Sequence, residues 1–126
     1  MPITYDVSAN GTFVYFTATG VLDVPDFEEV VKKTIADERI QPGFRQLLDL
    51  TSISSSRLTE ESLQQLKHLA RSSPKVTKNS QLAIVVSSGP SFERARNYEK
   101  MAHENFQDII VFNSLQTAKI WLGVED

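Results

Sequence analysis

The sequence predicts an α/β fold with a mostly parallel, mixed sheet of about five strands, an N-terminal antiparallel hairpin and about four helices. Apolar residues at the spacing of two that is typical of strands alternate along the chain with apolar residues at helical spacing. Two short segments, Leu47–Leu50 and Leu82–Val86, are almost continuously apolar, which indicates strands covered on both faces. Repeated alternation of strand and helix implies right-handed crossovers and a largely parallel sheet.

The hairpin is predicted at the beginning of the chain. Apolar and polar residues alternate in Ile3–Val7 and again in Thr12–Thr19, and Asn10 with Gly11 supplies a turn that tolerates positive φ. The second of these strands is apolar on both faces, so we expect it to lie deeper in the sheet than the first. Gly20 is expected to end it.

Two helices are predicted in the first two thirds of the chain. Asp23 and Pro25 mark the start of the first, because proline costs no hydrogen bond in the first turn of a helix. Thr59 opens the second, which stops at Pro74. The apolar residues of the first helix follow helical spacing and are expected to cover a face of the sheet: Phe27, Val30, Val31 and Ile35.

The last third of the chain predicts two more helices and a strand. A third helix follows the Ser87–Ser91 loop, and Ile109–Phe112 forms the last strand. Ser114 is placed to cap the final helix, and Gly123 to end it. We expect five residues of this helix to face inward: Leu115, Ala118, Ile120, Trp121 and Leu122.

Composition bounds the class of protein. The 126 residues fit one domain, 1–126, that can bury a core without covalent staples, and 40% hydrophobic and 23% charged residues are ordinary globular usage. No cysteine is present, which excludes disulfides, thiol catalysis and cysteine-ligated zinc. No secretory signal or apolar span of about 20 residues is found, so a cytoplasmic protein without a membrane span is expected. The net charge of −3 gives no general attraction to nucleic acid.

Three short motifs carry a family resemblance. The run from Gly20 to Asp23 precedes the first predicted helix, Leu47–Leu50 reads Leu-Leu-Asp-Leu, and Ile120–Leu122 reads Ile-Trp-Leu near the end of the chain. In this order, and with these elements between them, they resemble the STAS domains, the family of the sporulation anti-sigma-factor antagonist SpoIIAA. The small bacterial SpoIIAA-like (STAS/SEC14) proteins are the most similar. The resemblance spans nearly the whole chain and implies a SpoIIAA-like version of the fold described above.

The family also implies a phosphorylation site. In SpoIIAA-type antagonists a serine in an Asp-Ser-Ser/Thr-Gly motif, at the start of the helix after the Leu47–Leu50 strand, is phosphorylated by the anti-sigma kinase. The corresponding stretch here is Ser56–Glu60, which lacks the Asp and the Gly, and Thr59 is its nearest equivalent hydroxyl. The alternative role of Thr59 is an ordinary helix N-cap, with Glu60 and Glu61 favourably placed in the first turn.

The candidate binding site follows from the parallel sheet. The hydroxyl-rich segment Thr51–Ser56 is predicted to be a loop, and it and Ser87–Ser91 both leave the carboxyl ends of strands, where open α/β sheets bind ligands. The helix N-terminus after Ser91 would favour an anion, although turn and cap chemistry explains the same residues. The candidate binding residues are Asp49, Ser54, Ser55, Ser56, Thr59, Ser87, Ser88, Gly89, Ser91 and Arg94.

Catalysis is the class of function that the sequence favours least. Asp49 is either hydrogen-bonded for structural reasons, which is favoured, or aimed into a site. His68 and His103 lack metal-ligand spacing, and no acid, histidine and nucleophile set can be assembled. We therefore expect no enzymatic activity, catalytic residue, metal site or cofactor.

A binding function remains, in two versions. The first is a regulatory module that presents its strand-end serine loops to a protein partner or a small anion. The second is a carrier of a small apolar or lipid-like ligand, which the SEC14 resemblance implies. We also expect a homodimer, built on the hairpin edge or on the third helix, because unprotected strand edges and surplus aromatic residues are usually covered.

Overall fold

The structure is a computed structural model, and it describes residues 3–56, 61, 65, 68, 75, 80–87 and 108–124. The third predicted helix and most of the second lie outside the described residues, although Glu61, Gln65 and His68 of the second are helical. Two complete helices are described, fewer than the four or so expected for the whole chain.

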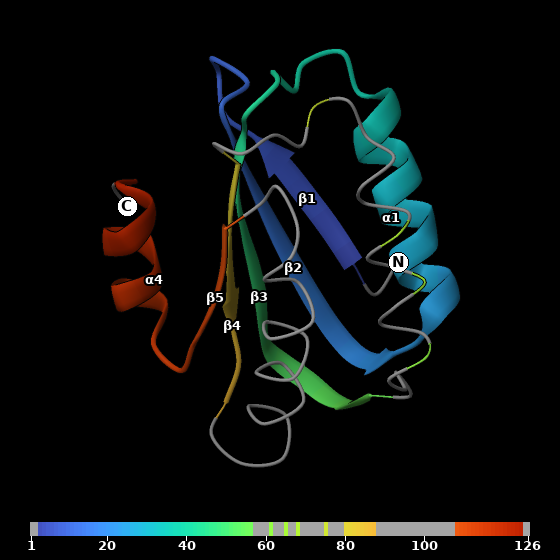
Figure 1. The fold of residues 1–126 in the computed structure, drawn as a ribbon. Coiled ribbons are helices and arrows are strands. Elements are labelled where there is room, and N and C mark those ends of the chain that lie inside the picture. Colours follow the sequence, from blue (N-terminus) through green and yellow to red (C-terminus); the bar gives the residue numbers. More distant parts are fainter. Residues whose placement is uncertain are drawn as a thin grey trace.

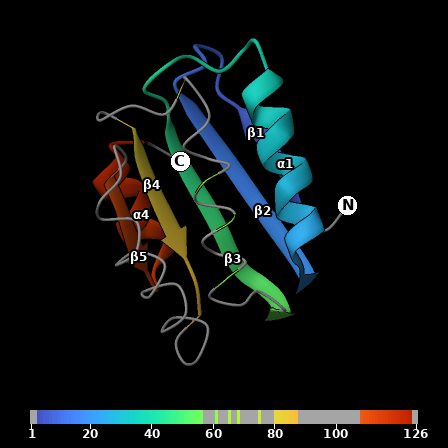
Figure 2. The same cartoon turned by 45° about the vertical axis from the view of Figure 1, so that its right-hand side comes forward.

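A five-stranded sheet forms the centre of the described structure. Its strands lie in chain order, β1-β2-β3-β4-β5; β1 is antiparallel to β2, and the other neighbours are parallel (Figures 1 and 2). The mixed sheet with an N-terminal hairpin, as predicted, is therefore confirmed, and β2 lies inside the sheet. The strands are β1 (Ile3–Val7), β2 (Phe13–Leu22), β3 (Arg45–Ser56), β4 (Gln81–Val85) and β5 (Asp108–Phe112).

The two helices lie on opposite faces of the sheet (Figure 1). On one face, α1 (Val24–Ala36) buries Val30 in a core that includes the β2 residues Val14 and Phe16. On the other face, α4 (Leu115–Leu122) packs over β3, β4 and β5. Within the described residues, no helix is long and apolar enough to cross a membrane.

The first helix begins where the sequence predicted. The side chain of Asp23 accepts a hydrogen bond from the N–H of Val24 at 2.8 Å, and Pro25 follows in the first turn. Both features satisfy or remove N–H groups that have no partner within the helix. On the outer side of the helix Lys33 Nζ lies 3.3 Å from Oε1 of Glu29, four residues earlier.

The expected end of the second strand was wrong. β2 continues through Gly20 to Leu22, and its pairing with β3 shifts in register between Gly20 and Val21. Gly20 has a φ of +72°, a conformation that L side chains rarely adopt, and open space surrounds the position where a Cβ would lie. The glycine therefore bends the strand at a bulge instead of ending it.

The expected serine loop was also wrong. β3 runs without interruption from Arg45 to Ser56, so that Thr51–Ser56 is strand and not loop. The reason is tertiary: the extended β2 supplies a partner for this segment, and Ser55 and Ser56 pair with Val21 and Leu22. The hydrogen bonds between β2 and β3 outweigh the local hydrogen bonds from Ser and Thr hydroxyls that favour a loop.

The last helix has the predicted caps but one wrong inward residue. The Ser114 hydroxyl accepts a hydrogen bond from the N–H of Thr117 at 3.3 Å, and Gly123 ends the helix in the left-handed conformation. Ala118 and Leu122 are buried against the sheet, whereas Ile120 is 72% exposed. The short helix follows 3.6 residues per turn, so residues 118 and 122 share one face and 120 lies on the other.

Candidate functional site

The carboxyl edge of the sheet gathers exposed hydroxyl groups. The pairing of β3 with β4 ends at Asp49 and Val85. Thr51 and Ser52 on β3 and Ser87 after β4 follow directly, and all three are exposed. The parallel register therefore brings together the ends of the two segments that the sequence singled out.

The other predicted site residues divide into two groups. The backbones of Ser54, Ser55 and Ser56 lie in β3, beside the end of β2, while their side chains are outside the described structure. Outside the described residues altogether are Thr59, Ser88, Gly89, Ser91 and Arg94.

Asp49 lies at the centre of a hydrogen-bonded cluster. Its Oδ2 accepts from the hydroxyl of Tyr15 at 3.0 Å, while its Oδ1 accepts from the N–H of Thr51 at 3.0 Å and from the Thr51 hydroxyl at 2.6 Å. Tyr15 comes from β2, so the carboxylate joins two strands. The structural interpretation of Asp49, favoured from the sequence, agrees with these bonds.

Tyr15, the tyrosine in this cluster, stays protonated and so remains a hydrogen-bond donor. Burial, together with the hydrogen bond to Asp49 and the charge of that carboxylate, raises the pKa of Tyr15 to about 12. Ionisation would place a second negative charge beside Asp49 in a half-buried position. Tyr15 therefore keeps its proton throughout the physiological range, and the cluster positions groups instead of transferring protons.

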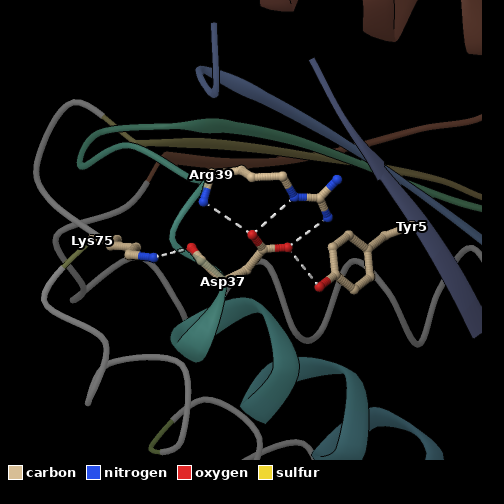
Figure 3. A network of polar contacts seen from close by, with 4 residues as sticks. All are labelled: Tyr5, Asp37, Arg39 and Lys75. Carbon is tan, nitrogen blue, oxygen red and sulfur yellow. Dashed lines mark hydrogen bonds and ion pairs between the residues drawn. The ribbon is translucent and has the colours of Figure 1, made fainter. Parts of the chain in front are cut away.

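A second polar network lies at the opposite, amino end of the parallel strands (Figure 3). Asp37, which ends α1, accepts from Nη2 of Arg39 at 2.7 Å and from the hydroxyl of Tyr5 at 2.9 Å. The N–H and Nε of Arg39 donate to the other carboxylate oxygen, each at 3.0 Å. Lys75 donates to the main-chain oxygen of Asp37.

The charges in this network are largely satisfied within it. The hydrogen bonds from Arg39, and then that from Tyr5, hold the pKa of Asp37 well below its ordinary value of 3.8. Burial, followed by the hydrogen bond to Asp37, raises the pKa of Tyr5. The network joins β1, the end of α1 and Lys75, so its role is to fix these segments to one another.

Sequence reasoning missed Tyr15, Tyr5 and Asp37. The two tyrosines occupy alternate positions of strands, where their rings look like ordinary core residues. Their partners Asp49 and Asp37 are 34 and 32 residues away, a separation that local patterns do not reveal. Asp37 and Arg39 are only two residues apart, so their ion pair was the one contact of these networks that the sequence could have indicated.

The site offers hydroxyl groups for recognition. In the part of the chain that the structure describes, no group of three or more His, Asp or Glu side chains is arranged to hold a metal ion. Ser52 and Ser87 can donate and accept hydrogen bonds at an exposed sheet edge, whereas Thr51, whose hydroxyl proton goes to Asp49, can only accept. Such groups suit contact with a polar or anionic surface.

Comparison with solved structures identifies the fold. An anti-sigma factor antagonist from Mycobacterium paratuberculosis is similar, with a TM-score of 0.61 and 18% identity, covering 98% of this chain and 95% of that one. A DUF3478-family protein from Shewanella loihica PV-4, uncharacterised and with a SpoIIAA-like fold, has a TM-score of 0.59 and 18% identity, covering 95% of this chain and 91% of that one. This chain has a SpoIIAA-like fold.

The SpoIIAA-like fold confirms the architecture that the sequence motifs implied. No protein-family model matches the sequence, and no curated protein matches it significantly. The likeness to the two solved structures, at 18% identity, therefore concerns the arrangement of the elements and not the chemistry of a site.

Proposed function

We propose that the protein is a non-enzymatic regulatory module of one domain that presents the carboxyl edge of its sheet to a protein partner in the cytoplasm. The observation that carries this proposal is the exposure of Thr51, Ser52 and Ser87 on adjacent strand ends. The anti-sigma factor antagonist with the same fold supports a protein as the partner, since such an antagonist acts through another protein.

The chemistry of the edge supports binding over catalysis. Asp49 is the carboxylate nearest to these hydroxyls along β3, and three hydrogen bonds from Tyr15 and Thr51 hold it in one orientation. The exposed groups of the edge are hydroxyls, which do not ionise near neutral pH. The Asp49 cluster supports a positioning role instead.

Phosphorylation would regulate such an edge. Thr59 follows β3 by three residues, and we propose it as the phosphorylated group, in the position of the family's serine. A phosphate there adds a charge of about −2 and changes the surface that a partner contacts. The loop residues Ser88, Gly89, Ser91 and Arg94 are proposed to contact the same partner or an anion.

The carrier of an apolar or lipid-like ligand stays the alternative prediction. None of the contacts among the described residues favours it. The edge groups that are exposed are hydroxyls, which suit a polar surface better than an apolar ligand.

The binding proposal is tested with purified anti-sigma-type proteins from the genome that encodes this chain. Isothermal titration calorimetry is expected to show binding, and the double variant Ser52→Ala with Ser87→Ala is expected to bind about tenfold more weakly. An exposed hydroxyl contributes about 0.7 kcal/mol when it is hydrogen-bonded to a partner, so the loss of two amounts to about 1.4 kcal/mol, which is tenfold in affinity. Addition of ATP followed by mass spectrometry identifies any modification of Thr59.

The matched control is Thr4→Ala, which removes an exposed hydroxyl from β1. This variant should bind as the unaltered protein does. Equal affinities for the control and for the double variant would show that the carboxyl edge is not the contact surface. Absence of binding to every anti-sigma-type protein tested would count against the regulatory proposal itself.

A further inference from the structure

The end of the β2–β3 pair extends beyond the rest of the sheet. β4 pairs with β3 only as far as Asp49, and after this residue the described part of β3 pairs only with β2. We call the segments Thr19–Leu22 and Ser52–Ser56 the arm. Figures 1 and 2 show this part of β2 and β3 curving away from the other strands.

The arm has one anchored side and one open side. Leu22 is buried and Ile53 packs against the same core on the α1 face. Val21 is 42% exposed and Ser52 is also exposed. The register of the two strands therefore decides which side chains the arm shows to solvent.

A bulge sets that register. Thr17 pairs with Asp49, but Thr19 pairs with Ser52, so β3 uses two residues where β2 uses Ala18 alone. Without this extra residue Thr19 would pair with Thr51 and Gly20 with Ser52, as far as the second shift in register between Gly20 and Val21. A shift of one residue exchanges the exposed and the buried side of a strand.

Asp49 holds the bulge in place. A bulged residue loses a ladder partner for its main-chain groups. Here the N–H of Thr51 donates to Asp49 Oδ1 at 3.0 Å instead, and the Thr51 hydroxyl donates to the same oxygen at 2.6 Å. The Tyr15 hydroxyl fixes the other oxygen at 3.0 Å, from the neighbouring strand.

We infer that Asp49 is a positioning residue that sets the register in which the arm begins, Thr19 with Ser52 and Gly20 with Ile53, and thereby decides that the carboxyl edge presents the Ser52 hydroxyl to a partner. The part that concerns a partner rests on the proposed function. The part that concerns the register does not, because the bulge and its hydrogen bonds are internal to the chain.

The register is tested by amide hydrogen exchange, measured by NMR on the protein alone. In Asp49→Ala the amides of Thr51, Ser52 and Val21 should exchange on the order of tenfold to a hundredfold faster, since a hydrogen bond to a charged group is lost. The amide of Leu47, where β3 is paired on both sides, should change little. Asp49→Asn keeps one acceptor oxygen and should restore part of the protection, and Tyr15→Phe should give an intermediate effect.

Asp6 supplies the matched control. It is an exposed carboxylate on β1, opposite Tyr15 across the hairpin, and its side chain accepts no hydrogen bond from another described residue. Asp6→Ala should leave the exchange of the arm unchanged. Unchanged exchange of the arm in Asp49→Ala, or acceleration spread equally over all strands, would overturn the inference. If Asp49→Ala does not fold, Asp49→Asn and Tyr15→Phe decide by the same criterion.

Calorimetry with the partner then tests the second half of the inference. Asp49→Asn, which is expected to speed amide exchange in the arm, should also lower the affinity for the partner. Asp6→Ala should change neither. A loosened arm with unchanged affinity would refute the link between register and recognition. If the unaltered protein binds no anti-sigma-type protein, the proposed function fails while the exchange result on the register still stands.

Discussion

Asp37 shows how one side chain joins distant parts of this chain. Its side chain is 11% exposed and accepts from Arg39 and Tyr5, and its main-chain oxygen accepts from Lys75 (Figure 3). The Arg39 side chain is 66% exposed, so the charge pair alone is screened by solvent. The hydrogen bonds, which join α1 to β1, are the more important part of the contact.

The Asp37→Asn variant should be less stable than the unaltered protein at neutral pH, with a lower urea midpoint at pH 7. Because folding lowers the pKa of Asp37 below its ordinary value of 3.8, the stabilisation is fully present above that pH. It is lost as the pH falls below about 4 towards the folded-state pKa. The difference in midpoint between the two proteins should therefore shrink steadily below pH 4.

The neighbouring Glu38→Gln is the control, since Glu38 is an exposed carboxylate next in the chain. Glu38→Gln should give the same urea midpoint as the unaltered protein at pH 7 and at pH 2.5. A midpoint difference for Asp37→Asn that is constant from pH 7 to pH 2.5 would contradict the assignment of the effect to the charged carboxylate.

Two large apolar residues of the helix α4 differ strongly in their exposure to solvent. Leu122 is 2% exposed and Ile120 is 72% exposed on the same helix, two residues apart. Nη1 of Arg45 donates to the main-chain oxygen of Leu122 at 2.5 Å, which holds the end of the helix against β3. The packing of one face and the hydrogen bond to the carbonyl group of Leu122 therefore hold the helix on the sheet.

Substitution of these two residues should have very different costs. Leu122→Ala should destabilise by about 2–5 kcal/mol, because it leaves a cavity in a packed core. Ile120→Ala should change the free energy of unfolding by less than about 0.5 kcal/mol, because the side chain is already in solvent. Urea denaturation at pH 7 measures both. Similar costs for the two variants would mean that Ile120 is covered in solution, for example by a second copy of the chain.

At the scale of the whole molecule, the sheet has two edge strands in the described structure, β1 and β5. Edge strands expose main-chain groups that can pair with another chain. The expected homodimer remains a prediction, and static light scattering at tens of micromolar should give twice the chain mass of 14.2 kDa. A particle of one chain mass at that concentration would refute it.

The class of fold, the hairpin, the existence and order of the five strands, the N-cap of α1 and both caps of α4 could be predicted from the sequence, although the ends of β2 and β3 could not. These follow from local rules: the apolar periodicity, the turn at Asn10 and Gly11, and the caps Asp23, Ser114 and Gly123. Each depends on residues within a few positions of one another, so the pattern is visible in one dimension. The family motifs extended this to the SpoIIAA-like arrangement.

The shape of the candidate site depends on contacts between residues that are far apart in the chain. Thr51–Ser56 has the composition of a loop, yet it forms a strand because β2 continues past Gly20 and pairs with it. Asp49 has its partner Tyr15 34 residues away, and that contact exists only once the two strands are in register. Local preferences are worth tenths of a kcal/mol per residue, and pairing with a distant strand outweighs them.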